Sequence, residues 1–129
     1  LVWTGLRWHV RGWCEKNQDY RDFVLSRFRG EPEVLDASDH TSASDEDWHT
    51  LVTIEIAPDP RLTADQQAVV AHDYGMTDGK WQLSVRAKLL PYLLQLLRLD
   101  PTQVMEDARA QQIVILNQAD IEAWLFPSG

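Results

Sequence analysis

The sequence has 129 residues, 44% hydrophobic and 25% charged, a composition typical of a globular protein that excludes a largely disordered chain. Its net charge of −8 is uneven, because residues 1–30 carry +3 and the remaining 99 residues carry −11. An anionic partner is therefore expected only near residues 1–30. The acidic remainder argues against duplex DNA binding by the chain as a whole.

The cellular location is predicted from the single cysteine and the first residues. Cys14 cannot form an internal disulfide, and the chain starts without a charged-then-apolar leader, so we expect a cytoplasmic protein. The longest apolar run, residues 89–99, is shorter than the roughly 20 residues of a membrane span, so no membrane partner is expected. Because the chain begins at Leu1 and its first residues already resemble the middle of a β-hairpin, we expect a fragment of a longer protein.

Residues 1–30 are predicted to be purely β. Residues 6–14 and 23–28 alternate between apolar and polar side chains, and the polar residues 15–19 join them, which indicates a hairpin. Residues 31–49 lose this periodicity and fill with Ser, Thr and Asp, so we expect an acidic linker or long exposed loop.

Residues 50–129 are predicted to form a separate α+β unit. Thr63 and Gln66 have the spacing of a capping box at a helix start, and Gly75 ends that segment. Residues 80–89 alternate cleanly, which predicts a strand buried on one side and antiparallel to its neighbour. The expected order is strand 50–57, helix 63–75, strand 80–89, helix 89–99, a turn of helix within 104–109, strand 113–116 and an amphipathic tail 120–126. The expected fold is a small antiparallel sheet with two helices on one face.

Two segments of the first 30 residues resemble the second half of a WYL domain. They are GLRWHVRGWC at residues 5–14 and YRDFVLSRF at residues 20–28. Trp8-His9-Val10 stands at the Trp-Tyr-Leu signature, with His9 in place of the tyrosine. The following Arg-x-Phe-x-Leu-x-Arg strand of the family is matched by Arg21, Phe23, Leu25 and Arg27. The later residues resemble the extension that often follows WYL domains and joins two subunits.

The resemblance implies a bacterial transcriptional regulator. Residues 1–30 would then be part of an Sm-like β-barrel that senses a ligand, in some members a nucleotide or single-stranded nucleic acid. An upstream winged helix, outside this sequence, would bind duplex DNA. The resemblance further implies that this chain senses an effector and forms a homodimer.

Five residues are candidates for contact with an anionic ligand: His9, Arg11, Trp13, Arg21 and Arg27. In the predicted strand 23–28, Arg27 shares a face with apolar side chains, so it needs either a structural acceptor or an anionic ligand. Arg21 continues that face. Trp8 and Trp13 could stack on bases or fill a core; we expect core packing for Trp8 and leave both options open for Trp13.

No catalytic, metal or cofactor site is predicted. The acidic segment contains Asp and His side chains but lacks the EF-hand, HExxH and paired-Cys spacings. Cys14 and the histidines show no nucleophile elbow, phosphate loop or nucleotide fingerprint. A small cytoplasmic enzyme is therefore the least favoured interpretation.

The leucine-rich segment 89–99 is the candidate dimerization element. Six leucines in eleven residues form a stripe wider than one core-facing side, so this helix is either buried on two sides or presents one side to a partner. A two-fold dimer suits regulators that bind paired half-sites. The rival to the sensor hypothesis is a protein–protein assembly module without a small ligand.

Overall fold

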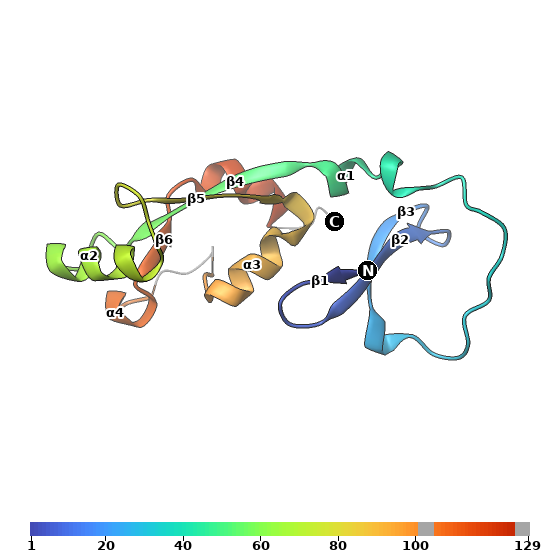
Figure 1. Cartoon of the computed structure of the whole chain (residues 1–129), viewed down its shortest axis with the longest axis horizontal. Helices are drawn as coiled ribbons and strands as arrows, with labels where there is room; N and C mark the ends of the chain where they lie inside the picture. The colour runs from blue at the N-terminus through green and yellow to red at the C-terminus, as the bar shows by residue number, and fades with distance from the viewer. Residues whose placement is uncertain (101–104, 126–129) are drawn as a thin grey trace.

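The computed structural model describes residues 1–100 and 105–125, and within them it contains two antiparallel three-stranded sheets and several short helices. The N-terminal sheet has strand order β1-β2-β3 and the C-terminal sheet has order β5-β4-β6. Figure 1 shows the two sheets as separate bodies of the fold, with α3 between the long strands of one and the hairpin of the other. The α+β prediction is confirmed, and the N-terminal sheet is open rather than closed into a barrel.

The N-terminal sheet consists of β1 (Val2–Trp3), β2 (Trp8–Cys14) and β3 (Asp19–Val24). The predicted hairpin is present, but the prediction of its second strand at residues 23–28 is wrong. The turn, where Gln18 has φ 50°, sets a register in which Cys14 pairs with Asp19 and His9 with Val24. The Phe28 amide then donates to the Leu25 carbonyl at 3.3 Å, and a 3-10 turn over Leu25–Arg27 carries the chain away from the sheet.

The register divides the N-terminal sheet into two faces. One face, which we call the covered face, carries Val2, His9, Arg11, Trp13, Tyr20, Asp22 and Val24. The opposite face, which we call the open face, carries Trp3, Trp8, Val10, Gly12, Cys14, Asp19, Arg21 and Phe23.

The acidic segment is exposed over residues 31–40, which Figure 1 shows as a wide loop between β3 and α1. The rest of the segment is more ordered than the predicted solvated linker. A 3-10 turn covers Ser42–Ser44 and is followed by α1 (Glu46–His49). Asp45 caps α1 by accepting from the Trp48 amide and is buried, with 4% of its surface exposed.

The C-terminal sheet confirms the three predicted strands. The central strand β4 (Leu51–Pro58) pairs antiparallel with β5 (Trp81–Arg86) on one side and β6 (Ile113–Ile115) on the other. In β5 the burial alternates as its sequence predicts, with Gln82 and Ser84 exposed. The predicted strand 80–89 is three residues too long at its end, because Ala87–Leu89 form a 3-10 turn that leads into the next helix.

The helices also follow the sequence pattern. In α2 (Ala64–Asp73) the side chain of Thr63 accepts from the Gln66 amide and the side chain of Gln66 accepts from the Thr63 amide, so the predicted capping box is present. α3 (Leu90–Leu97) has its proline in the first turn, where no backbone N–H is required. α4 (Ala108–Gln111), α5 (Gln118–Ile121) and a 3-10 turn over Glu122–Trp124 complete the unit. The predicted ends at residues 104 and 126 lie outside the described residues.

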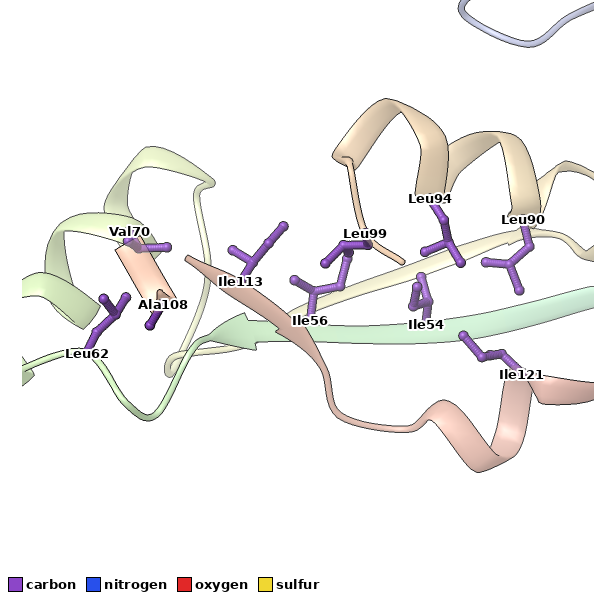
Figure 2. Packing of buried hydrophobic residues seen from close by; sticks show 10 residues of the cluster. All are labelled: Ile54, Ile56, Leu62, Val70, Leu90, Leu94, Leu99, Ala108, Ile113 and Ile121. Atoms are coloured by element: carbon purple, nitrogen blue, oxygen red, sulfur yellow. The ribbon is translucent and has the colours of Figure 1, made fainter. Parts of the chain in front are cut away.

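The hydrophobic core lies entirely in the C-terminal unit. Figure 2 shows Leu90 and Leu94 pointing from α3 toward Ile54 and Ile56 of β4, with Ile121 of α5 also directed at this strand. The cluster is completed by Leu62, Val70, Leu99, Ala108 and Ile113. None of the helices in the described ranges is both long and apolar enough to cross a membrane.

Candidate ligand-binding and dimerization surfaces

A buried ion pair joins the N-terminal sheet to the acidic segment. The Nε atom of Arg11 donates to Oδ2 of Asp45 at 2.6 Å, and its Nη2 atom donates to Oδ1 at 2.9 Å. A third bond runs from Nη1 to Oδ1 of Asp22 at 3.3 Å. Only 7% of the Arg11 side chain and 5% of the Asp45 side chain are exposed.

The pair shifts the pKa of both groups. Burial alone would lower the pKa of Arg11, but the hydrogen bonds and negative charges of Asp45 and Asp22 raise it above its ordinary value. Burial would likewise raise the pKa of Asp45, but the Arg11 guanidinium and the Trp48 amide hold it below its ordinary value. Both groups are therefore charged at neutral pH, and the cation of Arg11 is compensated within the chain.

Residues 40–45, which we call the strap, lie against the covered face. The imidazole of His40 stacks on the indole of Trp13 with ring centroids 3.6 Å apart and an interplanar angle of 5°. The Tyr20 hydroxyl donates to the Thr41 carbonyl at 2.7 Å. Next to these contacts lies a partly open cavity of about 320 Å³, whose lining includes Arg11, Trp13, Tyr20, His40, Asp45 and Trp48.

His9 lies on the same face and is buried, with 3% of its surface exposed. Its ring centroid is 5.1 Å from that of Tyr92 in α3, and its Nε2 atom is 3.5 Å from the Tyr92 hydroxyl. Its Nδ1 atom has no hydrogen-bond partner within residues 1–100 and 105–125. His9 therefore joins the N-terminal sheet to the dimerization candidate α3.

The open face presents aromatic side chains to solvent. Trp3 and Trp8 lie with ring centroids 5.3 Å apart, and Phe23 and Phe28 lie 6.4 Å apart. The expectation that Trp8 fills a core is wrong, because 49% of its surface is exposed. The register turns the side chain of Trp8 to the opposite face from buried His9.

The structure divides the five predicted site residues among three places. His9, Arg11 and Trp13 lie on the covered face, and exposed Arg21 lies on the open face. Arg27 is exposed on the 3-10 turn, so the prediction that it shares a strand face with two apolar side chains is wrong.

Four further residues belong to the covered face or pack against it and were not predicted as site residues. Tyr20 lies on the face itself, whereas His40, Asp45 and Tyr92 contact it from other segments. Asp45 carried a usable signal, since an aspartate directly before Glu46 and Asp47 fits a helix N-cap with an acidic first turn. No sequence signal pairs Arg11 with a residue 34 positions away.

α3 has two differently used sides. Leu90 and Leu94 are buried in the core. Leu89, Leu93 and Leu96 line a groove of about 260 Å³, together with Trp3, Thr4, Val85, Arg86 and Tyr92. Because 48% of the surface of Leu96 remains exposed, the surplus leucines leave apolar surface available to a partner.

The C-terminal unit matches a known protein family. Residues 51–121 match the family described as BrxR transcriptional regulator, C-terminal dimerization domain. This match begins at β4 and ends in α5, so it contains the whole second sheet and α3.

Longer similarity is found with repressors. The chain is 36% identical over 125 residues to the DNA-binding transcriptional repressor CapW of Stenotrophomonas maltophilia, covering 97% of this chain and 42% of that protein. It is 37% identical over 125 residues to CapW of Escherichia coli (strain KTE188), with the same shares of the two chains. CapW of Pseudomonas aeruginosa is 35% identical over 124 residues, covering 95% of this chain and 40% of that protein.

The chain therefore spans about two fifths of the length of these relatives, 42% and 40% in the two cases. The family description and the relatives' names are those of regulators, which confirms the expectation of a non-enzymatic role. With more than half of its residues inside the matched range, the chain belongs to the family of BrxR transcriptional regulator C-terminal dimerization domains.

Proposed function

We propose that this chain is the effector-sensing and dimerization region of a bacterial, cytoplasmic DNA-binding transcriptional repressor. One observation carries the proposal: the similarity to CapW repressors extends over 97% of the chain, and so includes the N-terminal sheet that the dimerization-domain match leaves out. Residues 1–30 are then the second half of a WYL domain, and an upstream winged helix contacts duplex DNA.

The proposed subunit contact uses the groove side of α3. Leu96 lines this groove with 48% of its surface exposed, and the partner is a second copy of the chain. Light scattering over a dilution series should show a dimer. The Leu96→Glu variant should dissociate at a concentration at least about tenfold higher, since a charge would enter an apolar contact.

Val69→Glu is the matched control, because Val69 is an exposed apolar residue on α2 outside the groove. A wild-type monomer at high micromolar concentration would contradict the dimer. Equal weakening by both substitutions would contradict the groove as its location.

The proposed effector is an anionic nucleotide or single-stranded nucleic acid. Arg11 and Trp13 line a cavity on the covered face that suits a phosphate and a base, and the exposed cations Arg21 and Arg27 attract an anion to the N-terminal sheet from outside that cavity. A thermal-shift series with AMP, ATP and a short oligothymidylate should raise the melting temperature. Arg21→Ala and Arg27→Ala should reduce that shift, whereas Arg109→Ala, which removes an exposed arginine of the C-terminal unit, should leave it unchanged.

The second candidate is an assembly module without a small ligand. It is favoured by the compensation of Arg11 by Asp45 and Asp22, since a cation with two internal carboxylate partners needs no external anion. Dimerization without a thermal shift from any anion would support this alternative and reject the sensor.

A further inference from the structure

We propose that Asp45 acts as an internal competitor at an effector site on the covered face: its carboxylate occupies the Arg11 position that a ligand phosphate would take, and ligand binding displaces the strap. This inference rests on the proposed sensor function and adds where the effector binds and how binding is relayed.

The geometry of the Arg11–Asp45 contact is that of ligand recognition. A guanidinium that donates from two nitrogens to two oxygens of one anion is the arrangement with which arginine binds phosphates and carboxylates. The two bonds of 2.6 Å and 2.9 Å meet this description. The Nε and Nη2 atoms form the edge that Asp45 occupies, and Nη1 donates to Asp22, so an anion that binds this edge must replace Asp45.

The surroundings of that edge suit an aromatic ring attached to a phosphate. The cavity of about 320 Å³ beside Arg11 falls in the lower part of the range of small-molecule sites, roughly 300–1,000 Å³. Its lining includes the rings of Trp13, Tyr20 and Trp48. His40 already stacks on Trp13 at 3.6 Å, so the indole has a demonstrated stacking surface that a base can take when the strap leaves.

Displacement of Asp45 would affect the dimerization domain through α1. Asp45 caps α1, and α1 ends two residues before β4 begins at Leu51. The Trp48 indole of α1 lies under the Arg86 guanidinium, 4.4 Å from its centre, and Arg86 donates to the Trp48 carbonyl at 2.8 Å. Loss of the cap therefore acts on both β4 and β5, which gives a ligand a means to favour one arrangement of the subunits.

The decisive variant is Asp45→Asn, which keeps the side-chain volume and removes the competing charge. We expect it to bind 5′-AMP and a 5′-phosphorylated oligothymidylate about tenfold more tightly than wild type in titration calorimetry. The two probes distinguish a free nucleotide from the end of a single strand. Arg11→Ala should lose binding of both.

The matched control is Asp47→Asn, which removes the same charge from the same short helix. Asp47 is 53% exposed and lies 3.7 Å from Lys88 rather than near Arg11. The affinity of the Asp47→Asn variant for both probes should stay within about twofold of that of wild type. If Asp45→Asn gains no more affinity than Asp47→Asn while wild type does bind, the competitor inference is overturned and the sensor function stands. If neither wild type nor Asp45→Asn binds any anion, both fail.

A measurement on the wild-type chain tests the inference without relying on a variant's folding. Saturating 5′-AMP should speed amide hydrogen exchange in residues 40–49 by at least about threefold, because the strap and the α1 cap are released. Slower exchange in this segment with 5′-AMP bound would mean that the ligand fastens the strap, and it would overturn the competitor role of Asp45.

Discussion

The two sheets of this protein are held in place by different forces. Every member of the hydrophobic core belongs to the C-terminal unit, between Ile54 and Ile121. The buried residues of the N-terminal region are polar, namely His9 in β2 and Thr4 just after β1, while Trp3, Trp8 and Phe23 are exposed. Local stability follows buried apolar contact, so we expect the C-terminal unit to be the rigid part and the N-terminal sheet to be the part that opens more readily.

The largest expected effect on stability comes from creating a cavity in the C-terminal core. Ile54→Ala removes a side chain with no exposed surface and should lower the free energy of unfolding by about 2–5 kcal/mol. Leu25→Ala in the N-terminal region, where 42% of the leucine is exposed, should cost less than about 1 kcal/mol. Urea unfolding at equal protein concentration measures both, and similar losses would remove the distinction between the two regions.

The fold of the rigid region was the part that the sequence predicted well. The alternation of β5, the capping box at Thr63 and the leucine spacing of α3 are each local patterns reinforced by burial in one core. In the N-terminal sheet the alternation of residues 23–28 continued past Val24, where the strand ends. The register there is set by the turn near Gln18 and not by burial, so hydrophobic periodicity could not locate the strand end.

The candidate site was predictable only in part for the same reason. His9, Arg11 and Trp13 were chosen from residue type and spacing, and their period of two places them on one face. Their partners His40, Asp45 and Tyr92 are brought in by the strap and by α3, and contacts between distant segments leave no periodic signal.

A second test concerns the contact between the two regions at Gly5. Gly5 has φ +91°, and a β-carbon there would lie 2.5 Å from Cδ1 of Leu96 in α3. Gly5→Ala should therefore lower the unfolding free energy by about 1–3 kcal/mol, through backbone strain and a clash with the helix.

Gly30→Ala separates the two causes, because Gly30 also has a positive φ, +75°, but a β-carbon added there would meet no atom within 4 Å. A loss at Gly5 no larger than that at Gly30 would show that the hairpin does not rest on α3. Adding Leu96→Ala to Gly5→Ala should recover the part of the loss that comes from the clash.

A third test lowers the pH and follows the stability of the C-terminal unit. Arg61 donates from its side chain and its amide to Asp59, and these bonds hold the pKa of that carboxyl below its ordinary value despite burial. A carboxyl with a lowered folded-state pKa stabilises the fold above its unfolded pKa, about 3.9, and this contribution is lost as the pH falls through the folded pKa.

Asp59→Asn should accordingly cost about 1–2 kcal/mol at pH 7 and progressively less below about pH 4. Thermal unfolding of both proteins from pH 7 to pH 2 measures the difference. A gap that stays constant with pH would assign the effect of the substitution to packing rather than to charge.

The smallest expected effect tests whether local helix signals matter once the core is formed. Thr63→Ala removes the hydroxyl that accepts from the Gln66 amide and should cost about 1 kcal/mol. Thr63→Ser keeps the hydroxyl and should retain most of the stability. Because α2 contributes only Val70 to the buried core from within its span, its start depends on this cap more than on packing. The loss should therefore appear first as faster amide exchange in residues 64–68, with the exchange of β4 unchanged, whereas equal acceleration in β4 would show that α2 and the core unfold as one unit.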